Sequence, residues 1–421
     1  MDTKSSSAHE SYLVLGAGCF GASTAYHLKQ TLPASSVTLL DRGPFPNPSA
    51  AGHDLNKIIR ADYQDIFYMK LALEAQQYWR RDPIYRPYYH ESGMLYAEDK
   101  GMARANLDNL NAVGEKHHAE ILTPEETRAK FDGGEADRAL ESVISAAVKE
   151  GVIYNSSGVS TLCIDESAIC TGVRTEDGAE LKANRVILCT GAWTPKLLLD
   201  TAPHNKALHI GDRMVAAGAI QCTASYPPDQ MYKFKSMPVM FNGCDHTEGE
   251  CIPPTPQKML KFNYEVSFTN KEFHDGSGQT ISVPPARLDQ STWSQAVPQG
   301  LKKDEIHTVV DHVFGKWIDG IKIEDYRICW DAVTPNQDFI IDRHPNCKNL
   351  YFAGAGSFHS WKFLPTLGKY VLDMLQGTLD AEKASRWAWD RPNQGSALPA
   401  YVPRRDLKEI PGYEDVAKHF K

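Results

Sequence analysis

A glycine-rich turn close to the N-terminus is the first place where residue types and spacing could do chemistry. Gly16, Gly18 and Gly21 stand in the register G-x-G-x-x-G within GAGCFG, and Asp41 follows 20 residues after the last glycine. In such a turn the first glycine permits a sharp bend, the second lets the backbone approach a pyrophosphate, and the third lets a helix pack closely on a strand. An acid at the place of Asp41 accepts hydrogen bonds from a ribose diol. The same dinucleotide site is expected to include three neighbours of these residues: Cys19, Phe20 and Arg42.

The segments around this turn have the patterns of the elements that must position it. Residues 11–15 (SYLVL) are a run of strand formers, residues 22–32 have apolar side chains at helical spacing, and a second apolar run at 37–40 ends at Asp41. This order is the context in which the glycine motif indicates a dinucleotide-binding unit. The helix N-terminus would offer free N–H groups and the positive end of its dipole to phosphates. The acid favours a free 2′-hydroxyl, and hence FAD or NAD rather than NADP.

Later segments favour FAD over NAD. Residues 169–181 (ICTGVRTEDGAEL) predict a hairpin with a turn at Asp177-Gly178, and residues 184–191 (NRVILCTG) predict a buried strand. Residues 349–356 (NLYFAGAG) are a third strand-like run that ends in small residues. These segments resemble those of flavoproteins with two dinucleotide domains, in which the late strand carries the ribityl end of the flavin. An NAD-linked dehydrogenase, which would be colourless, is the alternative.

Composition and charge exclude several classes of protein. The 421 residues are 42% hydrophobic and 23% charged, as in a globular chain, and the net charge of −8 argues against nucleic acid as a partner. Apolar runs are too short to cross a membrane, no secretory signal precedes the first strand, and the C-terminal AKHFK is no peroxisomal tripeptide. Nine scattered cysteines without a CxxC pair predict neither a disulfide framework nor a metal site. We therefore expect a cytoplasmic protein without a membrane or nucleic-acid partner.

The order of the segments predicts an α/β fold with a discontinuous Rossmann-like FAD-binding domain. The pieces of this domain are residues 10–62, 143–210 and 325–385. The inserted segment 63–142 is helical in pattern, and the segment 211–324 alternates strand-like runs with proline-rich turns. The two inserted segments predict an α+β substrate domain built on a largely antiparallel sheet. Residues 386–421 are expected to pack as an irregular C-terminal extension.

Five blocks of sequence resemble the monomeric sarcosine oxidase family, and within it the fungal fructosyl amino acid oxidases (amadoriases) and the saccharopine or pipecolate oxidases. The blocks are GAGCFGASTAYHL, SAAGHDLNKIIRADY, LKFNYEVSFTN, RICWDAVTPNQDFIIDRHP and NLYFAGAGSFHSWKFLPTLGKYV. The resemblance implies an FAD-dependent enzyme that oxidises the C–N bond of a secondary amine on an amino acid and passes the electrons to O₂, giving hydrogen peroxide. We expect a monomer or weak dimer whose partners are a small amino acid substrate and O₂.

The resemblance also implies roles for single residues. The cysteine at the place of Cys329 bonds through sulfur to the flavin 8-methyl carbon. The lysine at the place of Lys261 lies near flavin N5, where its cation helps O₂ accept the first electron as superoxide. Arg60 and Lys362 correspond to a pair of cations that clamps the substrate carboxylate. A buried strand cysteine and a solvated strand lysine are the ordinary alternatives for the first two residues.

Further residues of these blocks are expected near the flavin or the substrate. Lys57, Gly356, His359 and Lys362 would lie at the flavin ring, with a structural histidine as the alternative for His359. Glu265 would contact the substrate amine or a second ammonium, with a strand-edge carboxylate as the alternative. The chain departs from the pattern of this family at Asp331, where a carboxylate replaces Tyr or Cys near the substrate, and at the bulky Phe358 and Trp361.

The expected reaction transfers a hydride equivalent from the carbon beside an uncharged amine to flavin N5, without a dedicated protein base. The imine then hydrolyses, or an internal ring captures it. Three kinds of substrate stay open: saccharopine, pipecolate or another N-alkyl amino acid; a fructosyl amino acid; and an N-methyl amino acid of fungal secondary metabolism.

Overall fold

A mostly parallel sheet holds the glycine-rich turn at its centre. The computed structural model describes residues 10–98, 100–117, 119–121, 139–234, 237–244, 248–254, 258–285, 293–314, 320–392 and 402–420. Within them the sheet has the strand order β16-β17-β8-β1-β2-β4, and only β16 runs antiparallel to its neighbour. The strands are β1 (Ser11–Leu15), β2 (Ser36–Asp41), β4 (Ile153–Ser156), β8 (Arg185–Leu188), β16 (Ile340–Arg343) and β17 (Leu350–Gly354).

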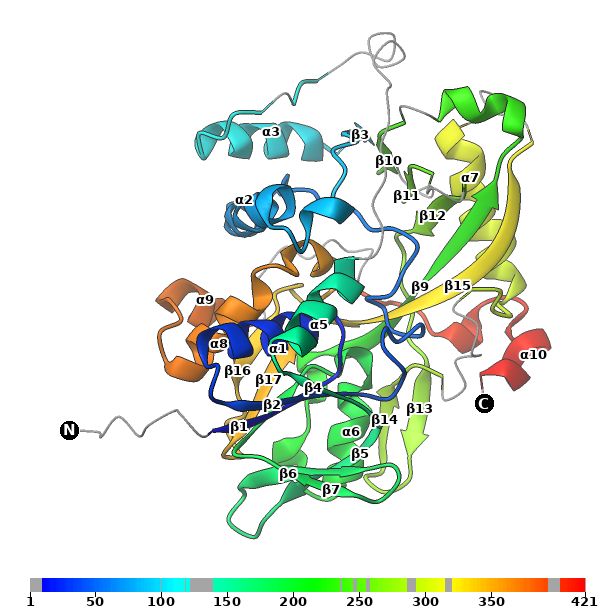
Figure 1. The fold of residues 1–421 in the computed structure, drawn as a ribbon. Helices are drawn as coiled ribbons and strands as arrows, with labels where there is room; N and C mark the ends of the chain where they lie inside the picture. The colour runs from blue at the N-terminus through cyan, green and yellow to red at the C-terminus, as the bar shows by residue number, and fades with distance from the viewer. Residues whose placement is uncertain are drawn as a thin grey trace.

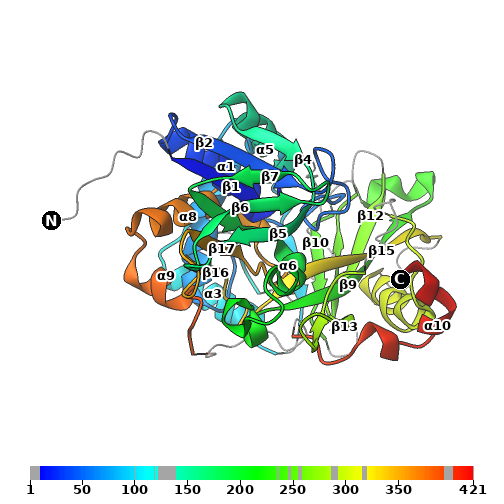
Figure 2. The same ribbon diagram turned by 90° about the horizontal axis from the view of Figure 1, so that it is seen from below.

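Helices cover one face of this sheet, and a small antiparallel sheet covers the other (Figure 1). The helices are α1 (Cys19–Thr31), α5 (Ala139–Lys149) and α8 (Leu367–Gln376), with α9 (Ala381–Arg386) beside them. The small sheet, which Figure 2 shows from below, consists of β5 (Val159–Ile164), β6 (Cys170–Thr175) and β7 (Glu180–Lys182). Helix α6 (Thr194–Thr201) packs against β5. Apolar side chains of β1 and β8 therefore lie between two covering layers, as expected of a parallel sheet.

A second, largely antiparallel sheet has the order β15-β9-β12-β11-β10-β3, in which only β10 and β3 are parallel. Its strands are β3 (Met94–Ala97), β9 (Val215–Ser225), β10 (Val239–Asn242), β11 (Gly249–Ile252), β12 (Leu260–Tyr264) and β15 (Lys322–Val333). Helix α7 (His307–Phe314) contacts β10, β11 and β12. Alternation along β12 sends Phe262 into the apolar core on the side of α7 and Lys261 into a cavity on the other side.

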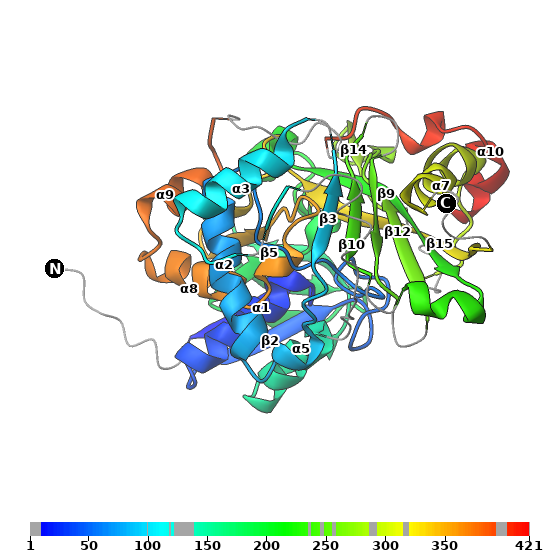
Figure 3. The ribbon, with the colours of Figure 1, turned by 90° about the horizontal axis from the view of Figure 1, so that it is seen from above.

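Two helices of the first inserted segment lie above the helical layer, as Figure 3 shows from above. These are α2 (Ile66–Arg81) and α3 (Met102–Ala112). The carboxylate of Asp65 accepts the N–H of Phe67 (2.9 Å) and so caps α2, whose apolar face is buried at helical spacing. Between the two helices the chain contributes β3 to the edge of the second sheet, so this segment joins the two sheets.

A β-hairpin and a short helix lie beside the second sheet. They are the hairpin of β13 (Lys271–His274) and β14 (Gln279–Ser282), and α10 (Tyr413–Val416) near the C-terminus. Arg405 holds the C-terminal extension in place by two hydrogen bonds to Glu305, of 2.6 and 2.8 Å. Among the described residues, no helix combines the length and the apolarity that crossing a membrane would need.

The predicted fold class, the hairpin at Asp177-Gly178 and the antiparallel character of the second inserted segment are confirmed. One placement differs. The sequence assigned residues 325–385 to the FAD-binding domain, but β15 pairs with β9 of the second sheet over its length. The reason is that β15 is one long strand that pairs with β9 from Lys322 to Val333. A domain boundary at residue 325 therefore falls inside a continuous ladder. Residues 122–138 of the helical insert lie outside the described residues.

Candidate active site

A cavity of about 1010 Å³ runs from the glycine-rich turn to the second sheet. This volume is at the upper end of the ~300–1,000 Å³ typical of small-molecule sites. The cavity is lined by every residue that the sequence analysis assigned to a site, with the exception of Gly21. A Cβ on Gly21 would lie 1.8 Å from the carbonyl oxygen of Gly16. Gly21 therefore serves the close packing of helix on strand, which is the role that the motif predicts for the third glycine.

One end of the cavity has the features of a dinucleotide site. Gly16 has a φ of +97°, and Gly18 is the N-cap of α1. A Cβ on Gly18 would meet no described atom within 4 Å, so the backbone is open there to the approach of a phosphate. The carboxylate of Asp41 accepts the N–H groups of Ala17 (2.7 Å) and Gly43 (3.2 Å). Asp41 thus fixes the turn and lines the cavity beside it.

Further along, a buried carboxylate gathers three cations. Asp54 Oδ2 lies 2.6 Å from Lys261 Nζ and 3.0 Å from Lys57 Nζ, and Arg327 Nη1 lies 3.9 Å from Asp54 Oδ1. The Asp54 side chain is fully buried, and that of Lys261 is 2% exposed. Burial alone would raise the pKa of Asp54, but Lys261, Lys57 and Arg327 hold it well below its usual range. Asp54 is therefore a permanent anion at the centre of a net positive cluster.

Burial lowers the pKa of Lys261, and the Asp54 carboxylate offsets part of this effect. For Lys57 the net effect is the opposite. Burial lowers its pKa, but Asp54 and then Cys329 outweigh the burial and raise the pKa. Lys261 also donates to the backbone oxygen of Asn56 (3.0 Å), and Arg327 donates to the backbone oxygen of His53 (2.7 Å). The second sheet thus binds the loop that follows β2 through both cations.

Asp54 is a site residue that the sequence analysis missed. It stands three residues before Lys57, a spacing that signals a local ion pair, but the loop around it has neither helical nor strand periodicity. Its partner Lys261 is 207 residues away in the chain. The sequence contains only the signal of an Asp-x-x-Lys pair, and this pair gives no reason to expect the two distant cations.

Arg60 is tied to an acid beside it. Its Nη1 lies 3.0 Å from Asp62 Oδ2, and Tyr96 and Asn106 also donate to the Asp62 carboxylate. Burial opposes the charge of Arg60, but Tyr96 and Asp62 together raise its pKa. Asp62 thus fixes the plane of the guanidinium, whose two other nitrogens could donate to a carboxylate.

Lys362 shares an aromatic neighbour with Arg60. The ring centroid of Tyr63 lies 5.3 Å from Lys362 Nζ and 4.9 Å from Arg60 Cζ, so both cations approach one ring. Lys362 Nζ donates to the backbone oxygen of His359 (3.1 Å), and its own carbonyl accepts Trp79 Nε1 of α2 (2.7 Å). Burial, reinforced by Arg60, lowers the pKa of Lys362 to about 7. The two predicted carboxylate-binding cations are thus brought together on one side of the cavity.

His359 is held as a neutral ring. Its Nε2 faces the backbone oxygen of Gln337 (2.9 Å) and must carry the proton, so Nδ1 accepts from the hydroxyl of Tyr63 (3.2 Å). Burial and then Lys362 lower the pKa of His359 to about 3. The ring packs 4.9 Å from those of Phe339 and Tyr68, between centroids. His359 lines the cavity, and its hydrogen bonds fit the structural alternative as well as a place at the flavin ring.

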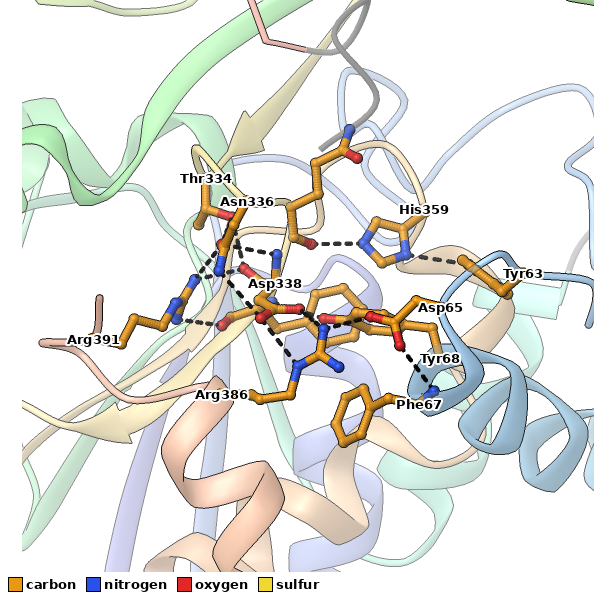
Figure 4. A network of polar contacts seen from close by, with 12 residues as sticks. Tyr63, Asp65, Phe67, Tyr68, Thr334, Asn336, Asp338, His359, Arg386 and Arg391 are labelled. Carbon is orange, nitrogen blue, oxygen red and sulfur yellow. Dashed lines mark hydrogen bonds and ion pairs between the residues drawn. The ribbon is translucent and has the colours of Figure 1, made fainter. Parts of the chain in front are cut away.

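A polar network supports this side of the cavity (Figure 4). Arg386 of α9 bridges Asp338 (2.8 Å) and Asp65 (2.6 Å), the residue that caps α2. Arg391 donates to the backbone oxygens of Asp338 (2.9 Å) and Phe339 (2.8 Å). The network joins α2, the loop before β16 and the start of the C-terminal extension, and so it fixes the surroundings of His359 and Lys362.

Cys329 and Asp331 project from β15 into the cavity. Cys329 is buried, and its strand neighbour across the ladder is Ala219. Asp331 accepts the backbone N–H of Phe358 (2.7 Å), in a loop where Ala355, Ser357 and Phe358 all have positive φ. Burial raises the pKa of Asp331, against the effect of its N–H donors. Asp331 therefore holds this strained loop, and it also lines the cavity, where its contact with the substrate stays a prediction.

Glu265 lies in the cavity with a second acid, Glu250, that the sequence analysis missed. Glu250 is on β11 and accepts a hydrogen bond from Asn263 of β12. Burial, then the neighbouring Glu250, raise the pKa of Glu265 well above its ordinary value. The segment GECI carries no motif, so only the pairing of β11 with β12 reveals that Glu250 belongs to the site.

Known proteins share this architecture. Residues 11–374 match the family model described as FAD dependent oxidoreductase. The chain is 26% identical to L-saccharopine oxidase of Schizosaccharomyces pombe, over 92% of this chain and 94% of that protein. It is 22% identical to monomeric sarcosine oxidase of a Bacillus species, over 87% and 93% of the two chains. A crystal structure of a thermally stable fructosyl peptide oxidase mutant superposes with a TM-score of 0.82 at 25% identity, covering 96% of this chain and 99% of that one.

These similarities agree with the family resemblance that the five sequence blocks indicated. They extend over the part of the chain that forms the glycine-rich turn and the two sheets. The family match covers most of the chain and includes every predicted site residue. The chain belongs to the FAD dependent oxidoreductase family, in the group of the sarcosine oxidases and amadoriases.

Proposed function

We propose that the protein oxidises the C–N bond of a secondary amine on an amino acid, with FAD as cofactor and O₂ as electron acceptor, giving an imine and hydrogen peroxide. The observation that carries this proposal is the single cavity in which a dinucleotide turn, the thiol of Cys329, the buried cation of Lys261 and the cation pair of Arg60 and Lys362 meet. The names of the similar proteins, L-saccharopine oxidase and monomeric sarcosine oxidase, support the substrate class.

The residues present fit FAD. The open backbone at Gly18 and the N-terminus of α1 suit a pyrophosphate, and Asp41 and Arg42 line the adenosine end. Lys57, Cys329, Gly356 and His359 would surround the ring system. The cofactor supplies a two-electron acceptor for the carbon–hydrogen bond beside the substrate nitrogen.

The chain's own residues position the substrate and set its protonation. Arg60 and Lys362 would hold the substrate carboxylate, which fixes the distance and orientation of the α-carbon. The same cations, with the Lys261 cluster, disfavour a positive charge on the amine and so favour its neutral form. No carboxylate base is needed for that proton, which can pass to solvent when the substrate binds.

Cys329→Ala tests a covalent link between the chain and the flavin. When the unsubstituted protein is precipitated with acid, we expect the yellow chromophore to stay in the pellet. In the variant we expect it in the supernatant, because the thioether sulfur is absent. The measurement is the absorbance spectrum of the two fractions. Cys222→Ala is the matched control, since this cysteine lies on the same sheet but faces the apolar core. A colourless pellet from the unsubstituted protein would disprove the covalent link.

Carboxylate binding should weaken as the pH rises above neutrality. With a pKa of about 7, Lys362 is charged below this pH and neutral above it. The inhibition constant of propionate, a carboxylate without an oxidisable amine, should therefore increase by up to about tenfold per pH unit above pH 7. Lys362→Met should weaken binding at low pH and remove this dependence. Lys369→Met is the control, because that lysine pairs with Glu74 at the surface. An inhibition constant that is flat with pH in the unsubstituted protein would contradict the prediction.

A peroxide-coupled panel identifies the substrate. It should contain saccharopine, pipecolate, N-methyl amino acids and fructosyl amino acids, the last because of the structural similarity to fructosyl peptide oxidase. Peroxide from at least one N-substituted amino acid, and none from the corresponding primary amino acids, is the expected result. A protein with bound flavin that oxidises only primary amines would overturn the proposed function.

A further inference from the structure

The aromatic ring of Tyr63 lies between the two cations that are expected to hold the substrate carboxylate. Its centroid is 4.9 Å from Arg60 Cζ and 5.3 Å from Lys362 Nζ. Arg60 stands in the loop after β2, whereas Lys362 stands in a short helical turn after β17, so the two cations come from distant parts of the chain. Tyr63 lines the cavity together with both of them.

The ring of Tyr63 is itself held from several elements. Its hydroxyl donates to Nδ1 of His359 at 3.2 Å (Figure 4), and its backbone oxygen accepts Nδ2 of Asn109 on α3 at 2.9 Å. The ring also packs against those of Tyr68 and Phe363, at centroid distances of 5.8 and 6.2 Å. Burial raises the pKa of Tyr63, so its hydroxyl stays protonated and can donate. A cation that contacts this ring is therefore positioned with it.

Two like charges so close together need a stabilising neighbour. Burial lowers the pKa of Lys362, and Arg60 lowers it further. Three carboxylates act in the opposite direction: Asp62, Glu250 and Glu265. The negative face of an aromatic ring also attracts a cation, most strongly where water is excluded. Because a ring accepts no conventional hydrogen bond, Tyr63 stabilises both charges and leaves their N–H donors for a carboxylate.

We propose that Tyr63 is the positioning residue of this cation pair: the face of its ring keeps Arg60 and Lys362 side by side and charged, while its hydroxyl orients His359. The inference rests on the proposed function, because it takes the substrate carboxylate to be the group that the two cations bind. It assigns the affinity of the pair to the charge of the ring face and not to the hydroxyl.

Two variants separate the ring from the hydroxyl. Titration calorimetry of the purified protein with propionate, at a series of pH values, measures the affinity of the cation pair. In the unsubstituted protein Kd should increase above pH 7, where Lys362 loses its charge. In Tyr63→Leu the increase should begin about one pH unit lower, and Kd at neutral pH should be about five- to tenfold larger, because the charged form of Lys362 has lost the ring. Tyr63→Phe should keep both values within about twofold, because it retains the ring. His359 adds no charge in this range, since its pKa is about 3.

Fluorinated phenylalanines at position 63 separate the charge of the ring face from its shape. Each ring fluorine weakens the negative charge of the face with little change in size, so the pH at which propionate binding weakens should fall stepwise as fluorines are added. The thermal midpoint of unfolding should stay the same along this series. Tyr78→Leu is the matched control, because this tyrosine of α2 is 38% exposed and lies outside the cavity lining. It should leave propionate binding unchanged.

The outcomes are distinct. Unchanged propionate binding in Tyr63→Leu, or an equal loss in Tyr63→Phe, overturns the inference. A loss that the fluorine series does not reproduce also overturns it, because the ring would then only fill space. If Tyr63→Leu does not fold, the fluorine series decides alone. A protein that oxidises no secondary amine contradicts the proposed function, yet the propionate titrations still decide on Tyr63. If the unsubstituted protein binds no propionate, the inference fails, while the peroxide-coupled panel still tests the proposed function.

Discussion

Lys261→Met is expected to lower kcat/KM for oxygen by about 10²–10³-fold, the loss typical when one preorganised electrostatic group is removed. Lys261 Nζ lies 2.6 Å from Asp54 in a fully buried ion pair, so its charge is fixed before oxygen arrives. Negative charge that develops on oxygen is stabilised strongly in such a water-poor site. Oxygen consumption, measured at saturating amine over a range of oxygen concentrations, checks the prediction.

Lys57→Met is the matched control for this prediction. Lys57 contacts the same Asp54 carboxylate at 3.0 Å, but its side chain is 18% exposed, so the variant removes a charge from the cluster without removing the buried cation. We expect a much smaller decrease in kcat/KM for oxygen in this variant than in Lys261→Met. Equal losses in the two variants would show that the net charge of the cluster matters and the position of Lys261 does not. A loss confined to KM for the amine would place Lys261 at the substrate.

Asp54→Asn is expected to destabilise the protein by about 3–5 kcal/mol, because it leaves buried cations without their anion. Lys261, Lys57 and Arg327 all lie within 4 Å of that carboxylate, and the first of them is 2% exposed. Without Asp54, burial and the neighbouring cations should lower the pKa of Lys261 further. Oxygen reactivity in the variant should therefore fall as the pH rises, since only protonated Lys261 carries the charge. The measurements are the urea midpoint of unfolding and a pH profile of oxygen consumption.

The effect of Asp54 on the free energy of unfolding should depend on pH in a known direction. The folded-state pKa of Asp54 lies well below its unfolded value, so its stabilisation is present in full above about pH 5 and is lost as the pH falls below about 4. The difference in unfolding free energy between the unsubstituted protein and Asp54→Asn should shrink in the same range. Glu180→Gln, at an exposed pair with Arg174, is the control and should change nothing measurable. A variant as stable as the unsubstituted protein at pH 7 would refute the account of the cluster.

Local patterns in the sequence were sufficient to predict the elements that neighbouring residues form. The strand, glycine turn and helix from Ser11 to Thr31 are formed by neighbours in the chain, and the hairpin at Asp177-Gly178 is fixed by its turn. The roles of Cys329, Lys261, Arg60 and Lys362 followed from resemblance, and the structure brings all four to one cavity. Their roles in the reaction remain predictions.

The cofactor-binding unit could be predicted from the sequence alone, because its glycines act through backbone geometry that is local in the chain. Tertiary structure decided the charges and partners in the site. Asp54 and Lys261 meet across 207 residues, and Gln221, Asn263 and Glu250 form one row only through the register of β9, β12 and β11. Coulomb interactions and burial depend on distance in space and not on spacing along the chain. The sequence therefore does not show which acid neutralises which cation, or which amide oxygen faces the cavity.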